Sequence, residues 1–149
     1  MWTDAILAYL HFAAIFMLIG FLAKEWTLLR AGAAALDINR LARADAGFGI
    51  AAGTVLVTGA LRAVYGAKGW AFYAHNPAFH AKMALFVAVG LLSIVPTMMF
   101  VRWRKAFAKD ATFRVTDADW RRARRLVLIE LHLVALIPLA AVIMSRGLG

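Results

Sequence analysis

The sequence predicts an all-α integral membrane protein built as a four-helix bundle, and three observations support this prediction. Apolar residues make up 64% of the chain, whereas soluble domains usually contain about 45–50%. The mean hydropathy is correspondingly high, at +0.76. The apolar residues fall into four blocks separated by charged segments, and the tryptophans mark the block ends. Lipid is therefore the expected solvent around most of the chain.

Four spans and their connections account for the whole sequence, so we expect a single transmembrane domain over residues 1–149. A helix that crosses about 30 Å of hydrocarbon needs roughly 20 mainly apolar residues. No stretch is left that is long enough for a separate soluble module. We expect the spans at about residues 5–23, 46–65, 78–100 and 126–144.

The connections between the spans differ in their expected structure. Residues 24–45 are rich in Leu, Ala and Arg, which favours helix extensions beyond the bilayer. Residues 66–77 are expected to form a loop. Thr116 and Asp119 have the spacing of a capping box and predict the start of the last helix.

The five tryptophans test these boundaries independently. Indole rings favour the headgroup level of a bilayer, so a belt of tryptophans is expected at both ends of the spans. All five fall at or just beyond a proposed span end, and none falls in the middle of one. They are Trp2, Trp26, Trp70, Trp103 and Trp120.

The basic residues predict the orientation. The first connection holds four Lys or Arg residues and the third holds nine, whereas the second holds only Lys68. The positive-inside rule then places the first and third connections in the cytoplasm and both termini outside. We therefore expect a multi-pass protein of the bacterial inner (cytoplasmic) membrane, N-out and C-out. The net charge of +9 is thus read as a topology signal, and no nucleic-acid partner is expected.

Several kinds of chemistry are excluded by what the sequence lacks. There is no cysteine, which rules out disulfides, thiolate metal sites and covalent haem attachment. No His-Glu-x-x-His motif occurs, and the Gly-x-Gly of Gly47 and Gly49 lies within a span, where it cannot be a phosphate loop.

Ionisable side chains within the spans are the candidate functional residues, because each costs a few kcal/mol to place in a bilayer. Such residues usually face the interior of a bundle or a water-filled cavity. Six lie within or at the ends of the predicted spans: His11, Arg62, His80, Lys82, Glu130 and His132.

Each candidate has a structural as well as a functional interpretation. His11 serves either as an interhelical hydrogen-bonding group or as an axial ligand to haem iron. Lys82 and Arg62 either extend to the membrane surface or bind an anion such as a carboxylate. Glu130 either pairs locally with Arg125 or takes part in a proton relay.

The outer halves of the first three spans could together form a tetrapyrrole site. A porphyrin needs an apolar slot, an axial ligand and cations for its propionates. His11, Arg62, His80 and Lys82 offer these groups, whereas His132 lies deeper. Helical rise also places His80 shallower than His11, so we expect haem b bound through His11 alone, with Lys82 and Arg62 on the propionates.

The sequence resembles a family of small four-helix bacterial inner-membrane proteins, a domain of unknown function. The resemblance covers most of the chain and implies topology rather than activity. The segments that carry it are Tyr65-Gly-Ala-Lys-Gly, Phe72-Tyr-Ala-His-Asn-Pro-Ala-Phe-His-Ala-Lys82, Leu91-Leu-Ser-Ile-Val-Pro-Thr97 and Trp103-Arg-Lys.

A second segment, His80-Ala-Lys82-Met-Ala-Leu, is similar to the His-Ala-Lys-Leu stretch of HemJ-type protoporphyrinogen oxidases. That family also carries a histidine early in its first span, which His11 matches. The resemblance implies haem binding by His11 and a requirement for Lys82, in a membrane oxidoreductase with an unidentified redox partner. That family's Asn-Glu-x-Pro motif is absent here, and Glu130 with the later Pro138 only partly echoes it.

Two other function classes remain open. Gly49 and Gly53 form a GxxxG pair, which is typical of close helix packing and also of helix dimers. A proton or small-solute transporter could be an oligomer that associates through this pair, with Glu130 as the carrier. Alternatively, the bundle is a non-catalytic scaffold in which the polar side chains only hold the helices together.

Overall fold

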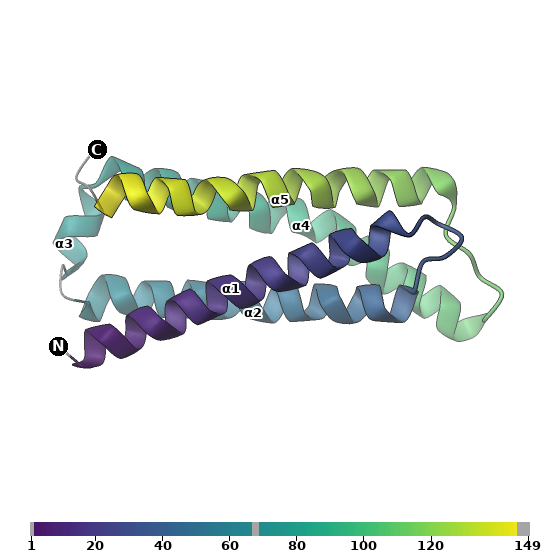
Figure 1. The fold of residues 1–149 in the computed structure, drawn as a ribbon, viewed down its shortest axis with the longest axis horizontal. Helices are drawn as coiled ribbons and strands as arrows, with labels where there is room; N and C mark the ends of the chain where they lie inside the picture. The colour runs from purple at the N-terminus through teal and green to yellow at the C-terminus, as the bar shows by residue number, and fades with distance from the viewer. Residues whose placement is uncertain (1, 67–68, 146–149) are drawn as a thin grey trace.

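The computed structural model describes residues 2–66 and 69–145, and within these ranges it contains helices and no strands. Four long helices run side by side as a bundle, and one short helix lies across one end (Figure 1). The predicted all-α four-helix architecture is confirmed. In chain order the helices are α1 (Trp2–Arg30), α2 (Ile38–Tyr65), α3 (Gly69–Ala74), α4 (Pro77–Lys109) and α5 (Asp117–Ser145).

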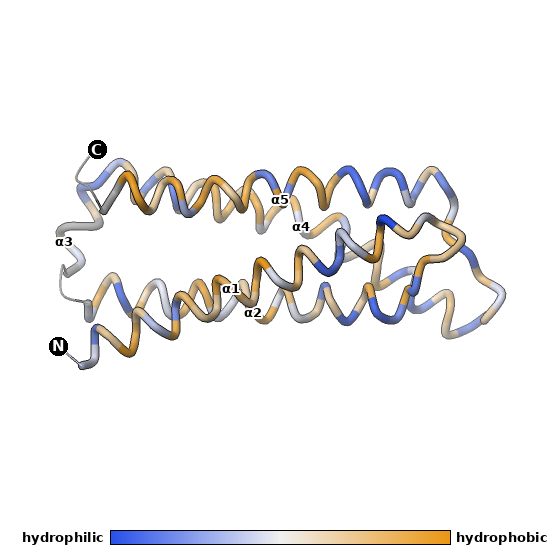
Figure 2. The backbone as a smooth tube through the Cα atoms, in the orientation of Figure 1, coloured by the Kyte–Doolittle hydropathy of each residue, from blue (hydrophilic) through white to orange (hydrophobic). Residues whose placement is uncertain are grey.

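The four long helices are apolar and long enough to cross a membrane. Large apolar side chains cover their outer surfaces: Phe16 is 73% exposed, Ile50 72% and Leu91 64%. Apolar segments run along the bundle, and hydrophilic segments are concentrated towards one end (Figure 2). A bundle with this outer surface is stable in lipid and would aggregate in water.

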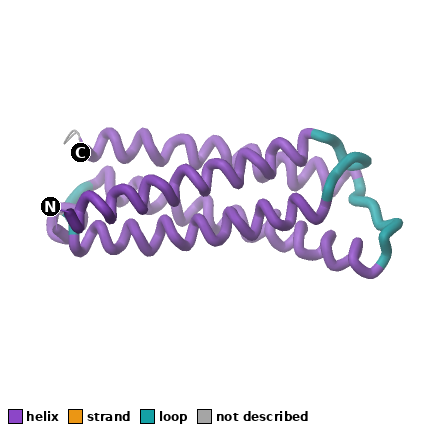
Figure 3. Tube along the Cα trace, turned by 60° about the horizontal axis from the view of Figure 1, so that its bottom comes forward, coloured by secondary structure: helices purple, strands orange, loops and turns teal. Residues whose placement is uncertain are grey.

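The two ends of the bundle differ in what they contain. The start of α1, the end of α5 and the short α3 lie together at what we call the terminal end (Figure 1). The connections 31–37 and 110–116 lie at the opposite end, the loop end (Figure 3). The assignment of the loop end to the cytoplasm remains a prediction from the basic residues.

The connections confirm two expectations and correct a third. Helix continues through residues 24–30 and 38–45, as the composition predicted. The Thr116 hydroxyl accepts a hydrogen bond from the Asp119 N–H at 3.2 Å, as the capping-box spacing predicted. The loop expected at 66–77 is wrong in part, because it contains α3. Asn76 then caps α4 by accepting hydrogen bonds from two backbone N–H groups.

The core includes a regular stripe of buried residues on α1. On α1 the buried residues recur every three or four positions, which places them on one face. This face packs mainly on α2, while α4 packs mainly on α5. The buried residues of α1 are His11, Ala14, Leu18, Leu22, Glu25 and Leu29.

Aromatic residues tie the helices together at the loop end. The Trp120 indole N–H donates to the Leu29 carbonyl at 2.8 Å. The Arg124 guanidinium carbon lies 5.2 Å from the Trp26 ring centre and 5.5 Å from that of Trp120, within cation–π range. Trp103 is buried, so it is a core residue rather than a membrane-surface anchor.

Candidate functional site

Most of the buried and half-buried ionisable residues of the bundle core form two groups at different heights. The first, here called the cationic cluster, consists of His11, Arg62 and Lys82 near the terminal end. The second, here called the acid cluster, consists of Glu25, Asp45 and Glu130 towards the loop end. Glu25 follows His11 by 14 residues on the same helix, which is about 21 Å at the helical rise.

His11 is held against α2 by a hydrogen-bond chain. Its side chain is buried, with 3% exposed, and its Nδ1 lies 2.9 Å from the Thr58 hydroxyl oxygen. That hydroxyl donates to the Thr54 carbonyl at 2.7 Å. Because a hydroxyl has a single proton, Thr58 accepts from His11, so Nδ1 carries the hydrogen. Nε2 is then the nitrogen with a free lone pair, the form that ligates a metal.

Gly59 allows this close approach of His11 to α2. A Cβ at position 59 would lie 3.1 Å from His11 Cε1, a tight contact for a side chain. Glycine at this position therefore lets the imidazole lie directly against the helix backbone, which fixes the plane of the ring.

Two cations complete the cationic cluster. Arg62 lies one turn beyond Thr58, with its guanidinium carbon 5.6 Å from the Phe12 ring centre. Its Nε is buried and has no hydrogen-bond partner. Lys82, on α4, is half-buried and lies within electrostatic reach of both Arg62 and His11. Among the described residues, neither cation has a carboxylate within ion-pair distance.

The other candidate histidines lie on exposed faces. A ring nitrogen of His80 lies 2.9 Å from the Ala74 carbonyl, and one of His132 lies 2.7 Å from the Leu128 carbonyl. In the ranges 2–66 and 69–145 the structure shows no hydrogen bond from either ring to the cationic cluster. The structure thus brings together three of the predicted cofactor-binding residues and leaves His80 and His132 apart from them.

The acid cluster draws on all four long helices. Glu25 of α1 and Glu130 of α5 are each 1% exposed, and Asp45 of α2 is 7% exposed. The carboxyl groups are close enough to interact electrostatically, Glu25 with both of the others and Glu130 with Asp45. From α4, the Thr97 hydroxyl donates to Asp45 Oδ1 at 2.6 Å. One carboxyl oxygen of each glutamate, Oε1, is buried without a hydrogen-bond partner in the described structure.

The local pairing of Glu130 with Arg125 is wrong. Arg125 is exposed, and among the described residues it makes no ion pair with Glu130. Glu130 lies on the buried face of α5, whereas Arg125, five residues earlier, is turned by about 140° around the helix. The two side chains therefore point in different directions.

Sequence reasoning also missed Glu25 and Asp45. Hydropathy placed them in a connecting segment because the apolar block ends before Lys24. The available signal was the spacing: Glu25 follows Leu22 by three residues and precedes Leu29 by four, on the same buried stripe. Periodicity would have placed it in the core where hydropathy did not.

A cavity is lined by the parts of α2 and α4 that lie between the two clusters along these helices. Its volume is about 240 Å³, and apolar and small residues line it, with Ser93 and Thr97 as its hydroxyl groups. Gly49, Gly53 and Gly90 belong to its lining, and a Cβ at any of them would meet no atom within 4 Å. The prediction that another helix of the same chain packs closely against Gly49 and Gly53 is therefore wrong. Their role in a helix dimer remains a prediction.

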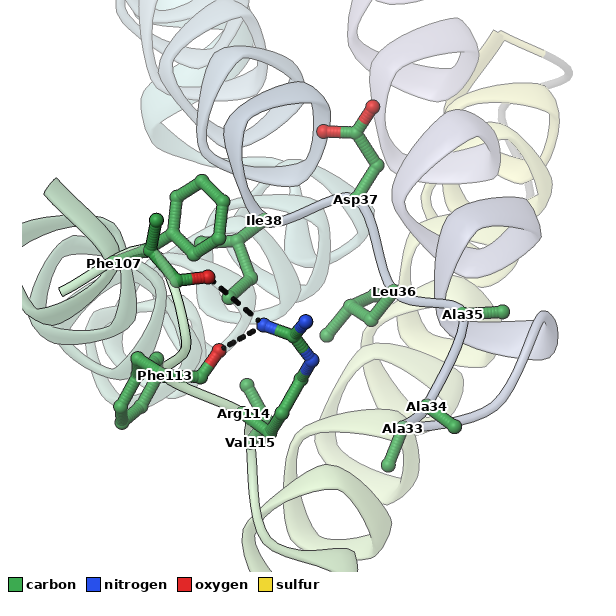
Figure 4. A pocket seen from close by; sticks show the side chains of 11 residues that line it. Ala33, Ala34, Ala35, Leu36, Asp37, Ile38, Phe107, Phe113, Arg114 and Val115 are labelled. Carbon is green, nitrogen blue, oxygen red and sulfur yellow. Dashed lines mark hydrogen bonds between the residues drawn. The ribbon is translucent and has the colours of Figure 1, made fainter.

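A second cavity, of about 300 Å³, lies at the loop end between the connections 31–37 and 110–116 (Figure 4). Arg114 bends back over it and donates to the carbonyls of Ala111 and Phe113 at 3.1 and 2.8 Å. Asp37 points away and caps α2, where it also pairs with Arg40. Arg114 and Asp37 therefore stabilise the two connections and the start of α2 through local hydrogen bonds and an ion pair.

Four apolar helices of membrane length around a core with buried charged groups define a polytopic membrane protein. A family model described as "Predicted membrane protein (DUF2214)" matches residues 3–149, so the chain belongs to this family. The predicted resemblance to a family of four-helix membrane proteins is thereby confirmed. No curated protein and no solved structure matches the chain, so the likeness to HemJ-type oxidases gains no support.

Proposed function

We propose that this protein binds a tetrapyrrole, in the first place haem b, at the cationic cluster and serves in redox chemistry or haem handling in the bacterial inner membrane. The observation that carries the proposal is the convergence of a buried histidine and two cations from three helices, with no carboxylate of the described residues paired to either cation. An axial ligand and two propionate partners are the polar groups that a haem site in an apolar bundle requires.

His11 would be the axial ligand. The Thr58 hydroxyl oxygen accepts the Nδ1 hydrogen, which leaves the Nε2 lone pair for iron. Hydrogen bonding of the second ring nitrogen is the usual way in which proteins orient a metal-binding histidine. Haem, when bound, would supply one-electron chemistry at its iron.

Arg62 and Lys82 would bind the propionates. The buried Nε of Arg62 lacks a partner, and an unsatisfied buried donor of this kind costs about 1–3 kcal/mol. A carboxylate from a ligand would satisfy it and would offset the repulsion between the two cations. If the protein is an oxidoreductase, Lys82 is the nearest candidate for a catalytic role, whereas Glu130 belongs to the acid cluster.

An absorption spectrum tests this proposal. Protein purified in mild detergent from a haem-replete host is expected to show a Soret band, and His11→Ala is expected to lose it. His132→Ala is the matched control, since this histidine is exposed and bonds only to its own helix; it should keep the band.

A colourless wild-type preparation that also leaves added haemin unchanged would contradict the proposal. If His11→Ala and Lys82→Met then lower only thermal stability, and no ligand is found, the scaffold alternative is favoured. Both outcomes are read from the same preparations.

Transport by an oligomer is the second candidate, and the open face at Gly49 and Gly53 favours it because small residues there are available to another helix. Mass measurement in detergent tests it: an oligomer that Gly53→Leu dissociates supports this candidate, and a strict monomer opposes it.

A further inference from the structure

The acid cluster holds three acidic side chains and no basic one, so its charge must be neutralised by bound cations or protons. The polar groups recorded in contact or electrostatic interaction with its carboxyl groups, among the described residues, are acids or a hydroxyl: Glu25 on α1, Asp45 on α2, Thr97 on α4 and Glu130 on α5. No basic side chain forms an ion pair with them within residues 2–66 and 69–145. Each unpaired ion buried in a protein costs several kcal/mol, so three carboxylates together would be strongly unfavourable without bound cations.

The geometry favours protons over a metal ion. Among the described residues, no three carboxylate or histidine groups converge in a way that could hold a metal. A shared ion needs several oxygens at about 2–2.6 Å, whereas a proton neutralises one carboxyl group at a time. The unpartnered oxygens of Glu25 and Glu130, each on a side chain that is 99% buried, are where such protons would reside.

Thr97 distinguishes Asp45 from the two glutamates. Its hydroxyl donates to Asp45 at 2.6 Å, which is the short distance expected for a hydrogen bond to a charged oxygen. A donor of this kind stabilises the carboxylate form. Asp45 is therefore the member best suited to carry the negative charge, while Glu25 and Glu130 lack any such donor.

The cavity reaches this cluster through Thr97. Thr97 is both a lining residue of the 240 Å³ cavity and the hydrogen-bond partner of Asp45. The cavity is several times larger than the roughly 30 Å³ that one water molecule occupies in the liquid. The hydroxyls of Ser93 and Thr97 offer water two hydrogen-bond partners on this side of the cavity.

We propose that Glu25, Asp45 and Glu130 form a proton-relay site within the membrane, which is reached from the cavity by way of Thr97. Two of the carboxyl groups hold protons and Asp45 is the carboxylate. In a transfer step the O–H bond of a glutamic acid breaks as its proton passes to a water molecule from the cavity, which in turn gives a proton to Asp45, so the charge of the site is unchanged. The glutamate then regains a proton from a hydronium ion in the cavity and Asp45 gives its proton to a water molecule, which restores the starting state. This inference is independent of tetrapyrrole binding.

Infrared difference spectroscopy tests which carboxyl groups hold protons in the resting state. Wild-type protein in vesicles of phosphatidylethanolamine and phosphatidylglycerol at neutral pH should show the carbonyl stretch of protonated carboxylic acids, shifted by deuterium oxide. Glu25→Gln and Glu130→Gln should each remove one contribution to the band. Asp110→Asn is the matched control, because Asp110 is fully exposed at the loop end, and it should leave the band unchanged.

Proton flux tests the relay. With an internal pH-sensitive dye, vesicles under a pH gradient should take up protons faster than protein-free vesicles. Glu130→Gln should reduce the rate to that of protein-free vesicles, because it removes an ionisable carboxyl group from the membrane interior. Gly90→Leu, which fills the cavity from α4, should slow it. A wild-type sample without the carboxylic acid band, or with a band that sodium ions abolish, overturns the proposal, as does flux equal to protein-free vesicles. None of these readings depends on a Soret band.

Discussion

The two polar clusters of the bundle core have opposite charge and are held in different ways. In the cationic cluster, His11 is fixed by a neutral hydroxyl, and the two cations beside it form no ion pair with any acid in the described part of the chain. In the acid cluster, Asp45 alone of the three carboxyl groups accepts a hydrogen bond from Thr97. Neither cluster neutralises the other, because about 21 Å of helix and an apolar cavity separate them. The two clusters are therefore separate in the core, and each of the two proposals above concerns one of them.

The largest expected effect comes from reversing a charge in the cationic cluster. Lys82→Glu is expected to weaken haemin binding about 100-fold, or ~2.7 kcal/mol, because a propionate loses a cation and meets a repelling carboxylate. Haemin titration followed by absorbance measures this. Lys109→Glu, an exposed change at the loop end, is the control and should bind as the wild type does. Equal affinities for all three proteins would remove Lys82 from the site.

The next largest effect is expected for Thr97, and Thr58 provides the comparison in the cationic cluster. Thr97→Val removes the hydrogen bond to the Asp45 carboxylate and should lower the free energy of unfolding by about 1.5–3 kcal/mol, the range for bonds to charged groups. Denaturant titration in detergent measures it. Thr54→Val, whose hydroxyl bonds only to its own helix backbone, is the control for the loss of a hydroxyl. A cost no larger than the control's would indicate that Asp45 is neutral.

Thr58→Val tests the same idea in the cationic cluster. Here the lost bond joins two neutral groups, His11 and Thr58, so the expected cost is smaller, about 0.5–1.5 kcal/mol. The variant should also bind haemin less tightly, because the ring loses its orientation. A larger cost than that of Thr97→Val would reverse the comparison between the clusters.

The smallest effect concerns an acid outside the membrane-spanning segments. Hydrogen bonds from the hydroxyl and N–H of Thr112 hold the pKa of Asp110 below its usual value. A lowered folded-state pKa adds stability at pH values above the unfolded pKa of about 3.9, and this stability is lost as pH falls through the folded pKa. Wild type should therefore exceed Thr112→Val in melting temperature at pH 7, and the gap should narrow towards pH 2.

The control for this pH dependence is Thr27→Val, whose hydroxyl bonds to a backbone carbonyl and to no acid. Its difference from wild type should not change with pH. A gap for Thr112→Val that stays constant from about pH 7 to pH 2 would show that the hydrogen bonds do not favour the ionised form of Asp110.

Hydropathy was sufficient for the four long helices, because lipid imposes apolar blocks of a fixed length. Intramembrane ionisable residues identified His11, Arg62 and Lys82 for the same reason. Glu25 and Asp45 were missed because they follow and precede the apolar blocks, although their spacing places them on buried faces. The open surroundings of Gly49 and Gly53 depend on how α2 and α4 are placed in space, which no local pattern specifies. The six-residue α3 is too short to show a helical period.

Haemin titration of two variants tests the separation of the clusters most directly. His11→Ala and Glu130→Gln each change one buried ionisable residue, the first near the terminal end and the second towards the loop end. We predict that His11→Ala loses the Soret band while Glu130→Gln binds haemin as tightly as wild type. Equal loss in both, or loss in Glu130→Gln alone, would contradict the assignment of the tetrapyrrole to the cationic cluster.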